Sequence, residues 1–460
     1  MKNVPDSMKI AKVIPLFKKG DKLEISNYRP ISLLPSFAKL LERIIYVRMI
    51  AFLKKFNIFS SSQFGFREQH STVHALMSFV GKVAHAIDKS LHTIGIILDL
   101  SKAFDTINHD ILLHKLSHYG VRGKALEWFR SYLTNRKQYV FLNEHASDLR
   151  HINCGVPQGS ILGPLLFILY INDFYRSSQV LSFILFADDT NLFFSHSDHK
   201  VLTDTVNNEL KKISQWIRAN KLSLNLQKTN YMLFSNSLDS LPSDIVFDNT
   251  PLQRVSHTKF LGVIVDSKLS WRNHIDTICK TISRNIGVIS RLRSTLSQSS
   301  LLMLYSSLIL PYLNYGLLVW GNTHQTLLER VFLLQKKSIR IVCDATLRSH
   351  TNPLFINNKI LKITDLYHFQ LGQFMYKYSK QMLPDAFHDM FVKNNLIHNY
   401  PTRQSNKFHL PLLRTCFAQN TFIFDGPKYW NKLPNEVKNA PSLNVLKKTL
   451  KEFLLDSYKT

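Results

Sequence analysis

The chain has 460 residues, 45% of them hydrophobic, which fits about two to four globular domains with a buried core. Its 58 basic and 32 acidic residues give a formal charge of +26, which is far from neutral and predicts a polyanionic partner. Nucleic acid is the first candidate and an anionic membrane surface the second. Four widely spaced cysteines form no Cys-x-x-Cys pair, which excludes a zinc knuckle and a disulfide framework and favours a reduced, intracellular setting.

The spacing of apolar residues predicts four regions in chain order. Residues 1–92 are basic and largely helical, with an amphipathic helix over residues 38–56. Residues 93–270 alternate strands and helices, whereas residues 271–345 are helical and basic, and residues 346–460 are less regular. The elements predicted in the second region are strands over 92–100 and 231–234, helices over 111–119, 123–133, 160–174 and 201–220, and a hairpin over 183–194.

Residues 301–320 carry no charge, and a run of this length could span a bilayer. However, Pro311, Asn314 and Gly316 interrupt the run. We therefore predict buried core helices rather than a membrane span.

Two adjacent carboxylates, Asp188 and Asp189, interrupt the apolar hairpin over residues 183–194. Buried carboxylates are costly when unpaired, and two neighbours raise each other's pKa unless a cation neutralises them. The pair therefore indicates a site for a divalent metal ion. The alternative is an ordinary turn, because Asp is common in turns.

A third carboxylate, Asp99, ends the apolar run over residues 92–100. This run is apolar enough to be buried on both faces, as in the centre of a sheet. If this strand lies beside the hairpin, Asp99, Asp188 and Asp189 meet at one edge of the sheet. Carboxylate oxygens suit Mg²⁺, and two such ions about 3.5–4 Å apart are used in nucleotidyl transfer.

Three segments in order resemble motifs A, B and C of reverse transcriptases: LDLSKAFD (98–105), GVPQGSILGPL (155–165) and FADDT (186–190). The resemblance is strongest to the non-LTR (LINE-type) retrotransposons, in particular the jockey-like and CR1-like group. Other parts of the chain resemble the remaining motifs of that group. They are IPLFKKGD (14–21), NYRPISLL (27–34), QFGFR (63–67), NLQKT (225–229) and KFLGV (259–263).

The resemblance implies an α+β fold of the right-hand polymerase type. It predicts fingers over residues 1–92, a palm with an antiparallel sheet over 93–270, a helical thumb over 271–345 and a helical or irregular extension over 346–460. The role of the extension is not predicted.

The resemblance also implies roles for individual residues. Asp99 and Asp188 would bind both Mg²⁺ ions, with Mn²⁺ as the alternative ion, and Asp189 would complete the site. Asp105 also matches the family, but capping of the following turn is favoured over metal binding.

Five further residues are predicted to contact the incoming dNTP. Lys18 and Arg29 would grip the triphosphate, with Lys19 as the alternative to Lys18 and a solvated basic face as the alternative to both. Phe104 would exclude a 2′ hydroxyl by steric clash, unless it is a plain core residue. Gln158 would lie in a turn against the nascent base pair, and Lys228 would protonate the leaving pyrophosphate or serve as a surface lysine.

These roles predict an RNA-directed DNA polymerase that uses an RNA template, a DNA primer and dNTPs. The alternatives are an RNA-dependent RNA polymerase and a catalytically silent nucleic-acid-binding remnant. Nothing in the sequence resembles the endonuclease domain of such elements, so we expect that activity from a missing N-terminal domain, upstream of Met1, or from another protein. The expected location is intracellular: the nucleus during reverse transcription and the cytoplasm as a ribonucleoprotein.

Overall fold

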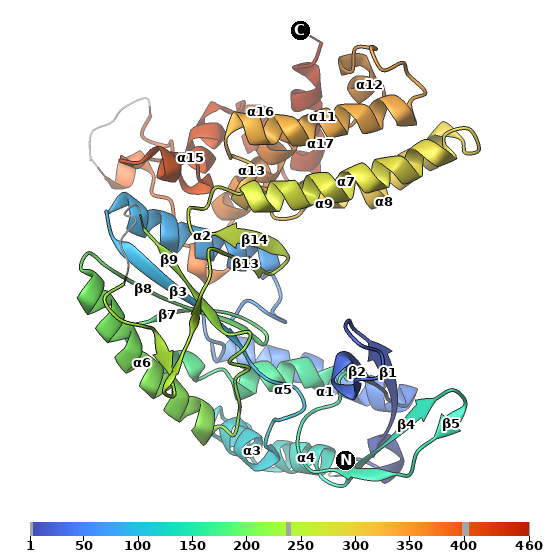
Figure 1. The fold of residues 1–460 in the computed structure, drawn as a ribbon, viewed down its shortest axis with the longest axis vertical. Coiled ribbons are helices and arrows are strands. Elements are labelled where there is room, and N and C mark those ends of the chain that lie inside the picture. The colour runs from blue at the N-terminus through green and yellow to red at the C-terminus, as the bar shows by residue number, and fades with distance from the viewer. Residues whose placement is uncertain (1–2, 236–240, 398–403, 460) are drawn as a thin grey trace.

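The computed structural model describes residues 3–235, 241–397 and 404–459. Met1, on which the expectation of an upstream domain depends, lies outside them. Figure 1 shows a sheet in the middle of the molecule, with the N-terminal strands at one end and the C-terminal helices at the other. The fold is of the α+β class.

The N-terminal sheet joins segments that are far apart in the chain. Strand β1 (Ile10–Phe17) pairs antiparallel with β2 (Tyr28–Leu33) and parallel with β4 (Arg136–Leu142). Two short strands, β5 (His145–Ala146) and β6 (Arg150–Ile152), pair with β4. The prediction that residues 1–92 are largely helical is therefore wrong for residues 10–33. These strands are stabilised by pairing with a strand about 120 residues later in the chain, which local periodicity does not reveal.

The central sheet has the strand order β12-β9-β3-β8-β7. All neighbours are antiparallel except β12 and β9, so the predicted antiparallel sheet is confirmed for its central strands. The bounds are β3 His92–Asp99, β7 Ser182–Phe186, β8 Asp189–His196, β9 Asn230–Phe234 and β12 Gln253–Arg254.

Side chains that alternate along these strands bury two different cores, because successive strand residues face opposite sides of a sheet. Ile94, Ile96 and Leu98 pack with the helices on one side. Phe193 and Phe234 pack on the other side. The central sheet is therefore covered on both faces, which explains why its strands are so apolar.

Helices of the first half of the chain cover the first face. They are α1 (Ser36–Lys55), α3 (His109–His118), α4 (Lys124–Leu133), α5 (Leu162–Tyr170) and α6 (His199–Ala219). The predicted helices over residues 38–56, 111–119, 123–133 and 201–220 are thus confirmed. The helix predicted over 160–174 is shorter, because it ends at Tyr170 and a 3-10 turn follows at Phe174–Ser177.

The second face is covered by α2 (Thr72–Asp88), which shares its core with the C-terminal half of the chain. A hairpin of β13 (His257–Phe260) and β14 (Val263–Asp266) leads into the helices. A smaller hairpin is formed by β10 (Val246–Phe247) and β11 (Thr250–Pro251). The helices that follow are α7 (Arg272–Leu292), α8 (Gln298–Leu308), α9 (Leu310–Asn314), α10 (Leu317–Trp320), α11 (Gln325–Val342), α12 (Asn352–Asn357), α13 (Ile363–Ser379), α14 (Cys416–Gln419), α15 (Phe422–Lys432), α16 (Asn435–Lys438) and α17 (Leu443–Asp456).

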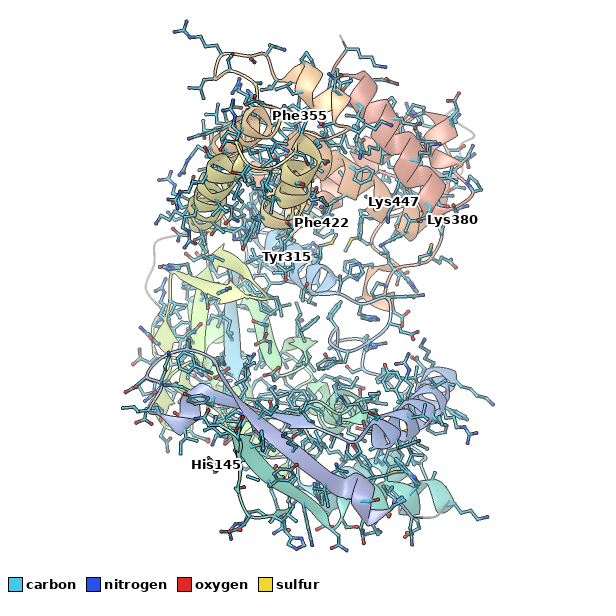
Figure 2. The ribbon with its side chains drawn as sticks, turned by 90° about the vertical axis from the view of Figure 1, so that its right-hand side faces the viewer. His145, Tyr315, Phe355, Lys380, Phe422 and Lys447 are labelled. Atoms are coloured by element: carbon cyan, nitrogen blue, oxygen red, sulfur yellow. The ribbon has the colours of Figure 1, made fainter. Side chains whose placement is uncertain are left out.

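The uncharged run over residues 301–320 forms parts of α8, α9 and α10, so the predicted helices are confirmed. Their burial is only partial, because Met303 and Tyr312 are exposed. Among the described residues, no helix is both long and apolar enough to cross a membrane. Figure 2 places Tyr315 between the central sheet and the helical region. Its hydroxyl donates a hydrogen bond of 2.5 Å to the Leu261 carbonyl, and so fixes these helices to the β13–β14 hairpin.

The last hundred residues pack onto the helical region rather than extending away from it. Helix α13 packs against α15 and α17, and their buried residues belong to the same core as those of α7 and α11. The chain also returns to α2, where the backbone N–H groups of Arg414 and Thr415 donate to Asp88 at 2.8 and 2.9 Å. The four-part division of the chain remains a prediction.

Candidate active site

The turn between β7 and β8 presents the two adjacent carboxylates. Phe186 ends β7 opposite Asp189, the first residue of β8, so Ala187 and Asp188 form the turn. Ala187 has a φ of 54°, a left-handed conformation that is uncommon for a residue with a side chain. The hairpin predicted over residues 183–194 is confirmed.

Residues 63–65, from a distant part of the chain, contact this turn and hold it in place. The Gln63 side-chain oxygen accepts hydrogen bonds from the N–H groups of Gly65 (2.7 Å) and Ala187 (3.1 Å). A Cβ on Gly65 would lie 2.3 Å from the Ala187 nitrogen, so only glycine allows this approach. The strained turn is therefore fixed by contacts with a distant segment.

The third carboxylate lies on the neighbouring strand. Asp99 ends β3 and is the register partner of Asp189 across the β3–β8 pair. Partial burial raises the pKa of Asp188, and the charge of Asp99 adds to this rise. Partial burial and the charges of Asp188 and Asp99 raise the pKa of Asp189 to about 6. The structure thus brings the three predicted carboxylates to one sheet edge, where they repel one another.

A divalent cation would relieve this repulsion, and carboxylate oxygens are the donors that such ions prefer. The donor chemistry of the three residues therefore fits a divalent metal ion. Across residues 3–235, 241–397 and 404–459, however, no three or more His, Cys, Asp or Glu side chains are arranged to hold one. The assignment of Asp99, Asp188 and Asp189 as metal ligands stays a prediction.

Three predicted dNTP-binding cations surround the carboxylates. Lys228 Nζ lies 3.5 Å from Asp99 Oδ2, an ion pair in which both side chains are partly exposed. Lys18, just after β1, and Arg29, on β2, lie close enough that their positive charges oppose the rise in the pKa of Asp188. The choice between Lys18 and Lys19 as the residue that binds the triphosphate stays a prediction.

The loop over residues 155–161 carries Gln158 and contacts the segment that follows β3. Gln158 Nε2 donates a hydrogen bond of 2.9 Å to Asp105 Oδ1, and its backbone oxygen accepts one of 2.7 Å from Ser32 N. A Cβ on Gly159 would lie 2.4 Å from the Ser32 oxygen, so this approach to β2 also requires glycine. The loop thus connects the central sheet to the N-terminal strands.

Asp105 does not cap the turn that follows it, so that expectation is wrong. The N-cap of α3 is Asn108, whose side chain accepts a hydrogen bond of 3.1 Å from Ile111 N. The Asp105 carboxylate instead binds Gln158. Partial burial raises the pKa of Asp105, and the hydrogen bond from Gln158 opposes that rise. The sequence alone did not show that Asn108, and not Asp105, would cap this helix.

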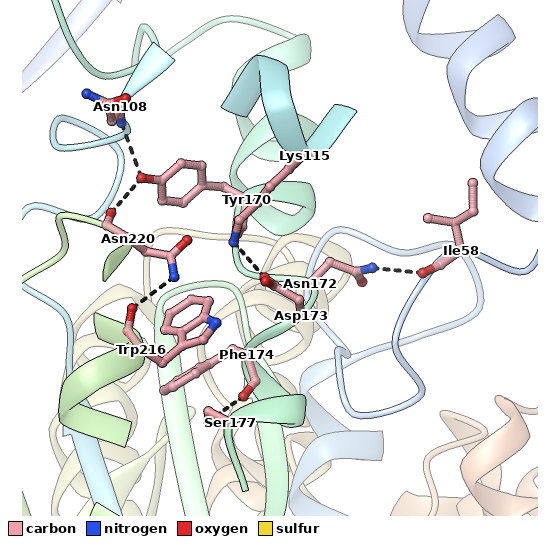
Figure 3. Close-up of polar contacts among 10 residues, drawn as sticks. All are labelled: Ile58, Asn108, Lys115, Tyr170, Asn172, Asp173, Phe174, Ser177, Trp216 and Asn220. Carbon is pink, nitrogen blue, oxygen red and sulfur yellow. Dashed lines mark hydrogen bonds and ion pairs between the residues drawn. The ribbon is translucent and has the colours of Figure 1, made fainter. Parts of the chain in front are cut away.

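Helix α5 continues from this loop and is anchored at its C-terminal end, as Figure 3 shows. The Tyr170 hydroxyl donates to the Asn220 oxygen at 2.6 Å and accepts from Asn108 N at 3.4 Å. Nearby, Lys115 forms an ion pair of 2.6 Å with Asp173. The loop therefore rests on a helix that is fixed to α3 and to the end of α6.

Phe104 lies in the segment between β3 and α3 and contacts both α5 and the loop over residues 155–161. Its ring stacks on Phe167 of α5 at 4.7 Å between centroids and meets Phe66 edge-on at 6.3 Å. Its backbone oxygen accepts a hydrogen bond of 2.9 Å from Val156 N. Phe104 is partly exposed, so it is packed like a core residue on one side while the other remains accessible.

Replacing Asp189 with Asn should stabilise the metal-free protein at neutral pH. The Asp189 carboxyl has a pKa of about 6 in the folded protein and about 3.9 in the unfolded chain. Because the folded state disfavours the ionised form, ionisation of Asp189 at pH 7 lowers the free energy of unfolding. This cost is fully present above pH 6 and decreases as the pH falls toward about 4. After allowance for solvent screening we expect a gain of about 1 kcal/mol, or about 2 °C in Tm.

The measurement is thermal unfolding in EDTA at pH 7.5 and at pH 4. The exposed Asp204 of α6 provides the control substitution, Asp204→Asn. A gain in Tm that is equal at both pH values would contradict the assigned pKa shift.

Comparison with known proteins shows the family to which this part of the chain belongs. The model of the family described as "Reverse transcriptase (RNA-dependent DNA polymerase)" matches residues 17–265, which include all of these residues. The probable RNA-directed DNA polymerase from transposon X-element of Drosophila melanogaster is 29% identical over 75% of this chain and 39% of its own length. The RNA-directed DNA polymerase from mobile element jockey of the same species is 28% identical over 78% of this chain and 40% of its own.

The chain thus spans about two fifths of the length of these curated relatives. The solved structure of apo telomerase from Candida Tropicalis is similar with 13% identity and a TM-score of 0.42, over 85% of this chain and 68% of that one. The family match covers more than half of the 460 residues, and the chain therefore belongs to the reverse transcriptase (RNA-dependent DNA polymerase) family.

Proposed function

We propose that this chain is the polymerase part of a non-LTR retrotransposon protein and copies RNA into DNA. The observation that carries the proposal is the meeting of Asp99, Asp188 and Asp189 at one edge of the central sheet. The family match over residues 17–265 supports the polymerase fold. As part of the same proposal, residues 1–92 form the fingers, 93–270 the palm and 271–345 the thumb. The role of residues 346–460 remains open.

Reverse transcriptases generally use divalent metal ions. In the proposed enzyme, Asp99 and Asp188 hold two Mg²⁺ ions and Asp189 completes the site, with Mn²⁺ as the alternative ion. When bound, such ions stabilise charge on the phosphate oxygens and make a hydroxyl more acidic.

The surrounding side chains act on the nucleotide. Lys18 and Arg29 bind the triphosphate, since both suit phosphate and both lie near Asp188. Phe104 lies under the sugar, and Gln158 holds the loop against the nascent base pair. Lys228 leaves its ion pair with Asp99 and gives a proton to the leaving pyrophosphate.

The proposed partners are an RNA template, a DNA primer and dNTPs, which the charge of +26 suits. The proposed endonuclease activity comes from another part of the protein or from another protein. The proposed location is the nucleus during reverse transcription and the cytoplasm as a ribonucleoprotein. No membrane partner is proposed.

A primer-extension assay tests the function. Purified protein is incubated with Mg²⁺, a DNA primer on an RNA template, and either dNTPs or rNTPs. We expect full-length DNA from dNTPs and little product from rNTPs, because Phe104 would clash with a 2′ hydroxyl. Exclusive use of rNTPs would support an RNA-dependent RNA polymerase instead.

The second candidate is a catalytically silent nucleic-acid-binding remnant, because the charge of +26 would suit nucleic-acid binding with or without catalysis. Tight binding of the primer–template without extension, in either Mg²⁺ or Mn²⁺, would establish that candidate and reject polymerase activity.

A further inference from the structure

An ionisable side chain lies almost completely buried behind the loop over residues 155–161. Glu42, on α1, is only 2% exposed. Its Oε1 accepts a hydrogen bond of 2.6 Å from the Tyr132 hydroxyl, and its Oε2 accepts one of 2.6 Å from the backbone N–H of Ile161. A single carboxylate therefore connects α1, α4 and the end of the loop.

A buried cation, Arg136, contacts the tyrosine that donates to Glu42. Arg136 is 1% exposed and lies with its guanidinium carbon 4.8 Å from the centre of the Tyr132 ring. Its Nη1 donates a hydrogen bond of 3.2 Å to the Tyr132 backbone oxygen. Buried charges are costly unless they are paired and hydrogen-bonded, so a well-packed apolar side chain would be expected here if stability alone mattered.

Glu42 acts on the start of α5. Ile161 is the N-cap residue of that helix and makes no side-chain cap of its own. Ser160 Oγ accepts a hydrogen bond of 2.8 Å from Gly163 N, whereas the N–H of Ile161 is bound by Glu42. A negative charge at a helix N-terminus is favourable, so Glu42 fixes where the loop ends and the helix begins.

The loop is held at its other end as well. His109, which is buried, has its Nε2 2.8 Å from the Gly155 oxygen, and burial lowers the pKa of this imidazole. Gln158 lies between these two ends and is bound by Asp105 and Ser32. The loop is thus held at Gly155 by an imidazole and at Ile161 by the carboxylate of Glu42.

We propose that Glu42 is a positioning residue that, through Ile161, sets the loop over residues 155–161 and hence Gln158 for the incoming nucleotide. This inference rests on the proposed polymerase function. Glu42 does not touch the nucleotide itself. Its effect reaches the nucleotide because small displacements of a binding group lower reaction rates strongly.

The test uses Glu42→Gln, which keeps the size of the side chain and removes its charge. We expect kcat/KM for dNTP to fall about 10- to 100-fold, as for other residues that orient a binding group. Most of this loss should appear as a higher KM for dNTP, with the Kd for primer–template within about twofold of wild type. Tyr132→Phe, which removes one of the two donors to Glu42, should shift KM in the same direction by less.

Hydrogen–deuterium exchange gives a second readout that does not depend on activity. Peptides covering residues 155–163 should exchange faster in Glu42→Gln than in wild type, because the Ile161 amide loses its charged partner.

The matched control is Tyr376→Phe. Tyr376 lies on α13, far along the chain from the loop, and is also buried. Its hydroxyl donates a hydrogen bond of 2.9 Å to the Ala440 oxygen. It should lose stability as Tyr132→Phe does but keep the wild-type KM for dNTP. A merely structural defect reduces the amount of active enzyme, and thus the apparent kcat, without changing KM.

Wild-type KM and wild-type exchange in Glu42→Gln would overturn the proposal, as would a loss confined to apparent kcat. If wild-type protein extended no primer, the proposed function would fail by itself. The positioning by Glu42 would then be judged from exchange over residues 155–163, where unchanged rates would reject it.

Discussion

Replacing Asp188 with Asn is expected to lower the rate of primer extension about 1,000-fold or more, the largest effect of any single substitution considered for this chain. Asp188 lies in the β7–β8 turn, and partial burial together with Asp99 raises its pKa. Asn keeps the size of the side chain but removes the charge that attracts a cation. Affinity for primer–template should change little, because that affinity comes mainly from basic residues.

The measurement is single-turnover extension, with primer–template affinity followed by fluorescence anisotropy. Asp204→Asn is again the control, since Asp204 is an exposed aspartate of α6 away from the turn. Extension by Asp188→Asn at the wild-type rate would show that the carboxylates at this edge are not the catalytic site. Equal loss in the control would indicate a general effect of lost negative charge.

The parts of the site that were predictable from sequence lie on continuous apolar segments. The run ending in Asp99 and the run interrupted by Asp188 and Asp189 are each long and apolar enough to fix a buried strand. Once both strands lie in one sheet, the carboxylates must meet at its edge. The register that places Asp99 opposite Asp189 follows from burial of alternate side chains on each strand.

The parts that were missed depend on contacts between distant segments. Strands β1 and β2 are completed by β4, more than a hundred residues later. The hydrogen bond between Asp105 and Gln158 depends on how the loop packs against β2 and against the segment after β3, which neither motif reveals alone.

Glu42 did leave a signal in the sequence. It falls four residues after Ala38 and seven before Met49, on the face of α1 whose apolar residues are buried. A carboxylate on the buried apolar face of a helix requires hydrogen-bond donors or a positive charge beside it. The helix was predicted, but the two partners of Glu42 come from α4 and from the loop before α5, and no local pattern identifies them.

Replacing Phe104 with Val is expected to reduce discrimination against rNTPs about 100-fold, the second largest effect. The ring is rigidly held, since it stacks on Phe167 and meets Phe66 edge-on, and its backbone is bound to Val156. A rigid side chain can exclude a hydroxyl by clash, whereas a mobile one would move aside. Val lacks the ring, so the space beneath the sugar should open.

The measurement compares kcat/KM for each dNTP with that for the matching rNTP. Phe104→Tyr is the matched control, because it keeps the ring and should keep the discrimination. Val also removes the stacking contact with Phe167, so a stability loss of about 1–3 kcal/mol is expected and the assay temperature must lie below the Tm of the variant. Because the ratio of kcat/KM for dNTP to kcat/KM for rNTP is measured on one protein sample, a loss of folded enzyme lowers both values equally and does not change the ratio. An unchanged ratio in Phe104→Val would therefore show that Phe104 is a core residue and that sugar selection depends on another group.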